Sequence, residues 1–157
     1  MRRSNTLRRT ELYGNYNNKC DNNNRILIVD DEVGITTVYT LGLQDNGFKV
    51  DAFNDPLQVL SDFKSGSYNL VLIDYKMPNM NGLELYREIR KIDAKVKICF
   101  VTAFDIYPGE MKKEFHRNSN GKYQDKEDED SDIIKCIIQI PIGIDELVKR
   151  IKEQLNS

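Results

Sequence analysis

The chain has few of the residue types that several functional classes require. Among its 157 residues there is no tryptophan, and His116 is the only histidine. Because His116 lies in a polar stretch, we expect it to be exposed, which excludes histidine-based catalysis and a role as phosphorelay donor. The three cysteines are odd in number and widely spaced, and Cys99 and Cys136 lie in apolar runs, where cysteine usually acts as a small hydrophobe. The sequence therefore predicts neither a disulfide framework nor a zinc site.

Long apolar runs are also missing. No run approaches the roughly 18 residues that suggest a membrane span, and no apolar segment follows Arg2 and Arg3, so an export signal is excluded. The formal net charge of -2 gives no overall attraction to nucleic acid or to an anionic membrane. With 39% hydrophobic and 31% charged residues, the chain is typical of a soluble, cytoplasmic protein of roughly one domain.

Two parts of the chain differ in composition. Residues 1–24 are polar, contain seven asparagines and have more basic than acidic residues, so we predict a disordered basic tail. An electrostatic tether for an acidic partner is an alternative function for this tail, but we assign it no specific role. Residues 25–157 are expected to form one folded domain.

Within that domain, short apolar runs alternate with segments of helical periodicity. The runs "ILIV", "LVLI", "KICFVTA" and "KCIIQIP" are typical of buried strands, and the alternating residues 48–52 indicate an outer strand. Such alternation predicts an α/β fold, a doubly wound parallel sheet of five strands with about five helices.

Helix starts and inward faces follow from capping residues and spacing. Asp55 and Pro56 predict one helix start, and Asp145 is a candidate cap of the last helix. We expect these inward-facing side chains, helix by helix: Ile35, Val38, Tyr39 and Leu41; Leu57, Leu60 and Phe63; Leu83, Tyr86 and Ile89; Leu147, Val148, Ile151 and Leu155.

The connection between Thr102 and Pro141 is too long for one crossover helix. It has 38 residues, where about 20 suffice. The excess, about residues 109–132, is charged and has no apolar stripe, which predicts a largely disordered surface insertion between strands four and five. A docking role for its acidic run is an alternative, and a short helix is expected near residues 111–115.

Polar side chains follow three of the predicted strands. Asp30, Asp31, Asp74 and Thr102 come at strand ends, and the carboxyl ends of parallel strands meet at one edge of the sheet. Three clustered carboxylates need a compensating cation, and oxygen ligands select Mg²⁺. If Asp30 and Asp31 merely capped the next helix, Asp74 would stay unexplained, so the metal site is the preferred interpretation.

Three motifs in this order carry a family resemblance. "ILIVDDE", "VLIDYKMPNMNG" and "FVTA" resemble the receiver domain of two-component response regulators, a flavodoxin-like fold. The spacings agree, with 43 residues from Asp31 to Asp74 and 28 from Asp74 to Thr102. The resemblance covers about residues 25–108 and 133–157.

The resemblance implies roles for particular residues. Asp74 corresponds to the phosphoacceptor, which takes a phosphoryl group from a histidine kinase. Asp30 and Asp31 correspond to the acidic pair that holds Mg²⁺, together with Asp74 and the backbone carbonyl of Lys76. Thr102 corresponds to the switch hydroxyl, which can donate a hydrogen bond to the phosphate. The turn after the phosphoacceptor matches at Met77, Pro78 and Gly82.

Two positions depart from the family pattern. Ile140 stands where receivers usually carry a lysine before the proline of strand five, and Ile137 stands where an aromatic ring is frequent. The departures remove a charge that pairs with the phosphate, so we expect phosphorylation to persist with Mg²⁺ but to be slower or to signal less strongly. We hypothesise that Lys76, two residues after Asp74, is a partial surrogate cation.

The resemblance favours a phosphoacceptor signalling protein that catalyses only its own Mg²⁺-dependent phosphorylation and dephosphorylation. Its expected partners are a histidine kinase or phosphotransfer protein and an unknown downstream protein, and the insertion puts output through the usual face in doubt. We expect a stand-alone receiver without an attached DNA-binding domain or membrane contact, as monomer or weak dimer.

The alternative is a pseudo-receiver, a binding module that signals independently of phosphate. An external phosphohydrolase lacks support, because Lys76 replaces the acid expected two residues after the nucleophile.

Overall fold

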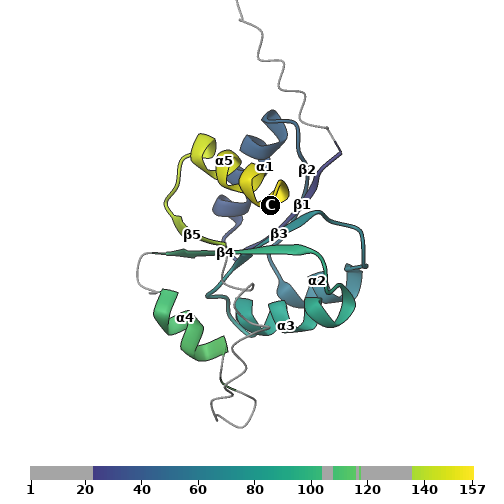
Figure 1. Ribbon diagram of the computed structural model, residues 1–157, viewed down its shortest axis with the longest axis vertical. Coiled ribbons are helices and arrows are strands. Elements are labelled where there is room, and N and C mark those ends of the chain that lie inside the picture. Colours follow the sequence, from purple (N-terminus) through teal and green to yellow (C-terminus); the bar gives the residue numbers. More distant parts are fainter. Residues whose placement is uncertain (1–22, 104–107, 116, 118–135) are drawn as a thin grey trace, which may run out of the picture.

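A computed structural model describes residues 23–103, 108–115, 117 and 136–157 of the chain (Figure 1). The predicted tail, apart from residues 23 and 24, and residues 118–132 of the predicted insertion lie outside the described residues. So does His116, for which exposure is predicted. In chain order the elements are β1 Arg25–Val29, α1 Val33–Asp45, β2 Lys49–Phe53, α2 Pro56–Asp62, β3 Leu70–Asp74, α3 Gly82–Ile92, β4 Lys97–Ala103, α4 Pro108–Phe115, β5 Ile137–Ile140 and α5 Ile144–Leu155. None of the described helices is long and apolar enough to cross a membrane.

The strands form one parallel sheet in the order β2-β1-β3-β4-β5. Helices α1 and α5 lie on one face, and α2, α3 and α4 lie on the other (Figure 1). After β2 the chain crosses back over β1, and β3, β4 and β5 then follow in sequence on the other side. The predicted doubly wound α/β fold is confirmed, and its order of connection reverses between β1 and β3.

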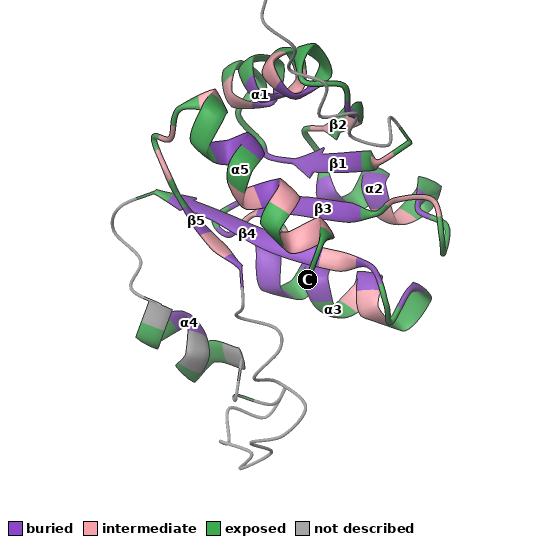
Figure 2. Cartoon of the chain, turned by 45° about the horizontal axis from the view of Figure 1, so that its top comes forward, coloured by how far each residue is buried: buried purple, intermediate pink, exposed green. Residues whose placement is uncertain are grey.

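Two apolar cores fill the space between sheet and helices. Strands β1, β3 and β4 are buried along almost their whole length (Figure 2), because helices cover both of their faces. Alternate residues of each strand contribute to opposite cores: Leu27 packs toward α2 and α3, while Ile26 packs toward α1 and α5. The "ILIV" and "LVLI" runs are apolar throughout for this reason.

Helix α1 buries a different stripe from the predicted one. As expected, Tyr39 is buried and Ile35 is partly buried against the core, but Val38 and Leu41 are each 58% exposed. The other buried residues of α1 are Thr36 and Leu43. Apolar side chains surround α1, so its sequence defines no single inward stripe. Packing against β2 and α5 selects the buried residues instead.

The helix starts confirm one predicted cap and correct another. The Asp55 carboxylate accepts a hydrogen bond from the Leu57 N–H at 2.9 Å, as predicted for the start of α2. Leu57 itself is 55% exposed, contrary to the prediction. Helix α5 begins after Gly143, and no side chain caps it. Asp145 is therefore not the predicted cap; it lies in the first turn, where its negative charge interacts favourably with the helix dipole.

Helix α4 occupies the first part of the expected insertion and contains the stretch where a short helix was predicted. Its Met111 side chain is fully buried in the core that α2 and α3 cover. The Tyr75 hydroxyl donates a hydrogen bond to the Glu114 carboxylate, and the Arg87 guanidinium donates to the Arg117 carbonyl at 3.1 Å. These contacts fasten α4 to β3 and α3.

The structure contradicts the prediction that no disulfide forms. Cys99 in β4 and Cys136, directly before β5, are disulfide-bonded, with Cα atoms 4.7 Å apart. Both are fully buried, as expected for cysteines in apolar runs. The pairing depends on the parallel register of β4 with β5, which brings together residues 37 positions apart. Spacing along the chain does not reveal such a pairing.

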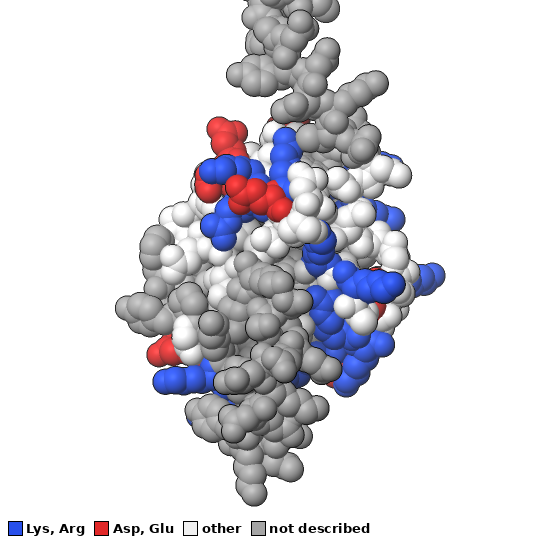
Figure 3. Space-filling view, in the orientation of Figure 1, with Lys and Arg blue, Asp and Glu red and all other residues white. Residues whose placement is uncertain are grey.

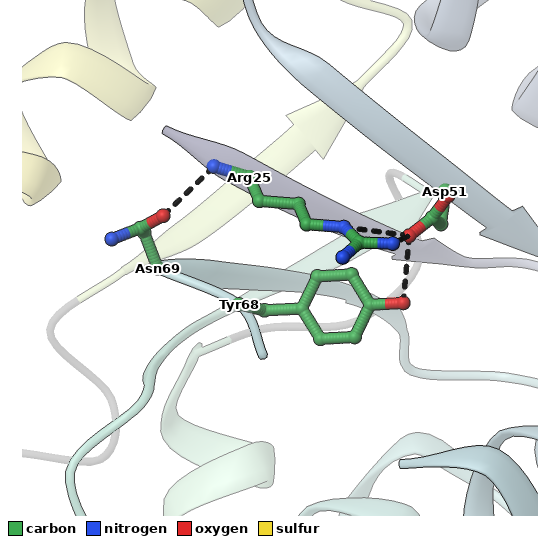
Figure 4. A network of polar contacts seen from close by, with 4 residues as sticks. All are labelled: Arg25, Asp51, Tyr68 and Asn69. Atoms are coloured by element: carbon green, nitrogen blue, oxygen red, sulfur yellow. Dashed lines mark hydrogen bonds and ion pairs between the residues drawn. The ribbon is translucent and has the colours of Figure 1, made fainter. Parts of the chain in front are cut away.

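A polar network holds the amino ends of three strands together (Figure 4). The Arg25 guanidinium donates to the Asp51 carboxylate at 2.7 Å and lies over the Tyr68 ring, 5.2 Å from its centroid. The Tyr68 hydroxyl donates to the same carboxylate at 2.9 Å, and Asn69 accepts from the Arg25 N–H at 2.8 Å. This network ties β1, β2 and the segment before β3 together at the edge opposite the strand ends that carry the acidic residues.

Candidate functional site

The acidic residues meet where β1 and β3 end. Asp30 directly follows β1, and Asp74 is the last residue of β3. Because these parallel strands are neighbours, paired from Ile26 with Leu70 to Val29 with Ile73, their carboxyl ends coincide. Carboxylate oxygens of Asp30, Asp31 and Asp74 lie within 4.8 Å of one another, among the described residues.

Asp30 is the most deeply placed of the three, at 4% exposure. Its Oδ1 accepts a hydrogen bond from the Glu32 N–H at 2.8 Å, which fixes the carboxylate at the start of α1. The Asn54 amide donates to the Asp30 backbone carbonyl at 2.7 Å and to the Thr36 hydroxyl at 3.0 Å. Sequence reasoning missed Asn54. The only signal that would have indicated it is its position immediately after the outer strand.

The electrostatics of the cluster explain why it needs a cation. Burial raises the pKa of Asp30 to about 6. The hydrogen bond from the Glu32 N–H lowers this pKa, whereas the nearby charges of Asp31 and Glu32 raise it further. Burial, followed by the charge of Asp30, raises the pKa of Asp74 to about 7. The Lys76 N–H, which donates to Asp74 Oδ1 at 3.4 Å, acts in the opposite direction. Negative charge is therefore costly here without a positive partner.

The donor set fits a hard divalent cation. Three carboxylates offer oxygen ligands in a small volume, and Asp31 is exposed to solvent, so water can complete the coordination. These oxygens suit Mg²⁺ rather than a softer metal, which would favour nitrogen or sulfur ligands. The prediction of an acidic cluster formed by Asp30, Asp31 and Asp74 is thus matched by the geometry.

The turn after Asp74 is shaped by its glycine. The Gly82 N–H donates to the Tyr75 carbonyl at 2.9 Å. A Cβ on Gly82 would lie 2.9 Å from the Tyr75 Cα and would also overlap the Asp74 carbonyl oxygen. Asn81 and Glu84 form a capping box that starts α3 directly afterwards. Close packing of this helix start against β3 positions the Asp74 backbone.

Thr102 is the second-to-last residue of β4, and Ile140 is the last residue of β5. Thr102 is buried, and its hydroxyl donates to the Ala103 carbonyl at 3.1 Å. In the register of the sheet, Thr102 pairs with Gln139 and Ala103 pairs with Ile140. Ile140 is partly buried and packs against the core that α1 and α5 cover, and Ile137 packs against the opposite core. Lys76 is exposed in the turn after Asp74.

Comparisons with known proteins agree with this architecture. The sequence profile of the response regulator receiver domain matches residues 26–116. The uncharacterized transcriptional regulatory protein YkoG of Bacillus subtilis is 36% identical over 86 residues, which cover 55% of this chain and 38% of that protein. Sporulation initiation phosphotransferase F of the same species is 32% identical over 82 residues, covering 52% of this chain and 66% of the relative.

A solved structure has the same fold. The crystal structure of a CheY-like response regulator receiver domain protein from Methanospirillum hungatei has a TM-score of 0.64 at 25% identity, and the match covers 85% of this chain and 94% of that chain. The fold and the acidic cluster define a doubly wound α/β protein with a functional edge at its topological switch point. This chain belongs to the response regulator receiver domain family, whose members work in two-component signalling systems. It spans well under two thirds of the length of YkoG.

Proposed function

We propose that this chain accepts a phosphoryl group on Asp74 and signals through the state of that residue. The observation that carries the proposal is the convergence of Asp30, Asp31 and Asp74 within 4.8 Å at the switch point of the sheet. A receiver domain is a signalling module rather than an enzyme that acts on external substrates. Catalysis is therefore limited to the phosphorylation and dephosphorylation of its own Asp74.

Each residue has a distinct part in this reaction. An oxygen of the Asp74 carboxylate attacks the phosphorus of a phosphohistidine, the N–P bond breaks, and its electron pair returns to the imidazole nitrogen. Asp30, Asp31, Asp74 and the Lys76 carbonyl would hold Mg²⁺, which when bound supplies positive charge for the phosphoryl oxygens. Burial of Asp30 and its Glu32 hydrogen bond keep the acidic residues in place.

Thr102 and Lys76 complete the proposed site. The Thr102 hydroxyl donates to the Ala103 carbonyl, and a rotation of the side chain would allow it to donate to a phosphoryl oxygen instead. Such a rotation would couple phosphorylation to the end of β4. Lys76 lies two residues after Asp74 on the exposed turn, within reach of a phosphate as a long, flexible cation.

The proposed partners follow from this chemistry. A histidine kinase or a phosphotransfer protein would supply the phosphoryl group, and a separate protein would read the result. One relative is named as a phosphotransferase of sporulation initiation, and another as the CAI-1 autoinducer sensor kinase/phosphatase CqsS of Vibrio cholerae. Both names connect such proteins with phosphoryl transfer, which is the chemistry that we propose for this chain.

Labelling with acetyl phosphate tests the proposal directly. The full chain is incubated with the phosphodonor and either Mg²⁺ or a chelator, and the added mass is located by mass spectrometry. We expect Mg²⁺-dependent phosphorylation of wild type and none in Asp74→Asn, because the amide is not a nucleophile. Asp62→Asn, a matched change on the exposed end of α2, should be labelled like wild type. Equal labelling of Asp74→Asn would refute the assignment.

A second prediction concerns Lys76. Lys76→Ala should slow phosphorylation of Asp74 by about fivefold, since one screened charge near the phosphate contributes about 1 kcal/mol. Lys95→Ala, which removes an exposed lysine beyond the end of α3, serves as the matched control. Rates are measured by quench and mass spectrometry across Mg²⁺ concentrations. If both variants match wild type, the surrogate-cation role is wrong.

A pseudo-receiver is the second candidate, and Ile140 is the observation that favours it. This side chain ends β5 with an apolar group where a receiver usually places a charge, and it packs into a core. A binding module of this kind would engage its partner equally in wild type and Asp74→Asn. Acetyl phosphate labelling decides between the two, because only the phosphoacceptor takes up label at Asp74.

A further inference from the structure

Two buried cysteines lie side by side near the edge of the sheet. Cys99 is in β4 and Cys136 directly precedes β5, and their side chains are 0% and 1% exposed. Their Cα atoms are 4.7 Å apart, within the range of about 4.4 to 6.8 Å that a disulfide requires, and the structure joins them. The receiver function uses neither residue, so this pair needs its own explanation.

The position of the pair matters because β5 is an edge strand. It has four residues and, within the described part of the chain, pairs only with β4, whereas β4 is held between β3 and β5. A short strand with a single neighbour gives up few contacts when it opens, so local opening costs less there than in the central strands. The Phe100 N–H donates to the Cys136 carbonyl at 2.9 Å, which places the cysteine pair at the first step of the β4–β5 ladder.

We propose that Cys99 and Cys136 are a reversible redox modification site. In the disulfide form the bond fastens β5 to β4, and in the dithiol form only the ladder and the apolar packing hold this edge. The same ladder continues to Thr102, which pairs with Gln139, and ends at Ala103, which pairs with Ile140, while β4 on its other side pairs with β3 as far as Asp74. The oxidation state of the pair thus sets how readily the strand next to Thr102 separates from the sheet. This site does not depend on phosphorylation of Asp74.

The chemistry balances with a small-molecule disulfide, such as oxidised glutathione, as the oxidant. One cysteine thiolate attacks a sulfur of that disulfide, its S–S bond breaks, and one small thiolate leaves. The second cysteine thiolate then attacks the mixed disulfide and releases the other small thiolate. The protein loses two thiol protons, and the two electrons reduce the small disulfide to two thiols. Because both sulfurs are buried, exchange requires opening of β5 and is slow in the closed protein.

The first experiment asks whether the bond is made and broken in the folded chain. Wild type is equilibrated with oxidised or reduced glutathione, free thiols are alkylated under denaturing conditions, and the linked peptides are identified by mass spectrometry. We expect a Cys99–Cys136 linkage after oxidation that reduction fully reverses. Two alkylated thiols at these positions under both conditions would overturn the proposal.

The second experiment asks whether the bond controls β5. Hydrogen exchange of residues 137–140 is compared between the oxidised and reduced protein, with residues 26–29 of β1 as an internal reference. We expect exchange in β5 to accelerate by about tenfold or more on reduction while β1 is unchanged. An identical hydrogen-exchange rate of β5 in the oxidised and the reduced protein would show that the disulfide does not hold β5 to β4.

Variants separate this pair from the third cysteine. Cys20→Ser is the matched control, since Cys20 is not part of the pair, and it should keep the full redox response. In Cys136→Ser, the backbone amides of β5 should exchange their hydrogens rapidly under both oxidising and reducing conditions. A redox response that survives in Cys136→Ser, or disappears in Cys20→Ser, contradicts the assignment. If Cys136→Ser does not fold, the two forms of wild type still decide the question.

Discussion

The side chains of Asp30 and Asp74 are held in a place that disfavours their charged forms. Burial is the largest cause in both cases, and it raises the pKa of Asp30 to about 6 and that of Asp74 to about 7. A structural role would favour neutral side chains at these positions. Carboxylates with raised pKa values are typical of functional sites, and a bound cation would relieve the repulsion between them.

At this scale the raised pKa values predict how stability depends on pH in the absence of metal. The unfolded chain titrates Asp near 3.9, so between about pH 4 and pH 7 the folded state binds more protons, and these two groups lower stability as pH rises. Asp74→Asn should therefore be more stable than wild type by about 1 to 3 kcal/mol at pH 8. The difference should vanish toward pH 4.

The measurement is urea unfolding with a chelator present, across that pH range, for both proteins. Asp62→Asn, at an exposed carboxylate, should track wild type throughout. A variant Asp74→Asn that is less stable than wild type at pH 8 would show that the carboxylate stabilises the fold rather than straining it.

The start of α3 shows how an element positions a functional residue. Gly82 brings the helix against the backbone of Asp74 and Tyr75, and the Asn81 capping box fixes where the helix begins. The turn therefore constrains β3, and with it Asp74, through backbone contact. On the opposite flank, α4 reaches the same strand through Tyr75 and Glu114.

Two helical glycines allow a matched test of this element. Gly82→Ala should destabilise the protein by about 1 to 3 kcal/mol and slow labelling of Asp74, because its Cβ has no room beside the β3 backbone. Gly34→Ala in α1 has open space around the new Cβ and should stabilise by about 0.5 to 1 kcal/mol. Thermal unfolding and acetyl phosphate labelling measure both effects. Equal behaviour of the two variants would contradict the close approach at Gly82.

Two groups of charged side chains lie at different places on the molecule. Acidic residues gather at the carboxyl ends of the strands, while Lys and Arg side chains gather where α3 ends and β4 begins, on the right of Figure 3. At the amino ends, Arg25 is paired with Asp51 and stabilises the sheet locally. A metal bound at the acidic end stabilises the entire fold, since the unfolded chain does not assemble the three carboxylates.

This predicts a global response to Mg²⁺. At ten times the dissociation constant, binding should add about 1.4 kcal/mol of stability and raise the melting temperature by about 3 to 6 °C. Asp31→Asn should lose most of this increase, and Asp145→Asn, a matched change on the exposed start of α5, should keep it. Calorimetric unfolding with Mg²⁺ and with a chelator measures the shift. An equal shift in Asp31→Asn would exclude it as a ligand.

The sheet and the acidic cluster are predictable from the sequence alone. Continuous apolar runs require strands that are covered on both faces, and Asp30 and Asp74 follow such runs directly, so their convergence follows from the parallel fold. Only the tertiary structure decided which side of α1 is buried, that Asn54 supports Asp30, and that Cys99 meets Cys136. These features depend on which elements pack together and in what register, and residues far apart in the chain carry no local signal of that contact.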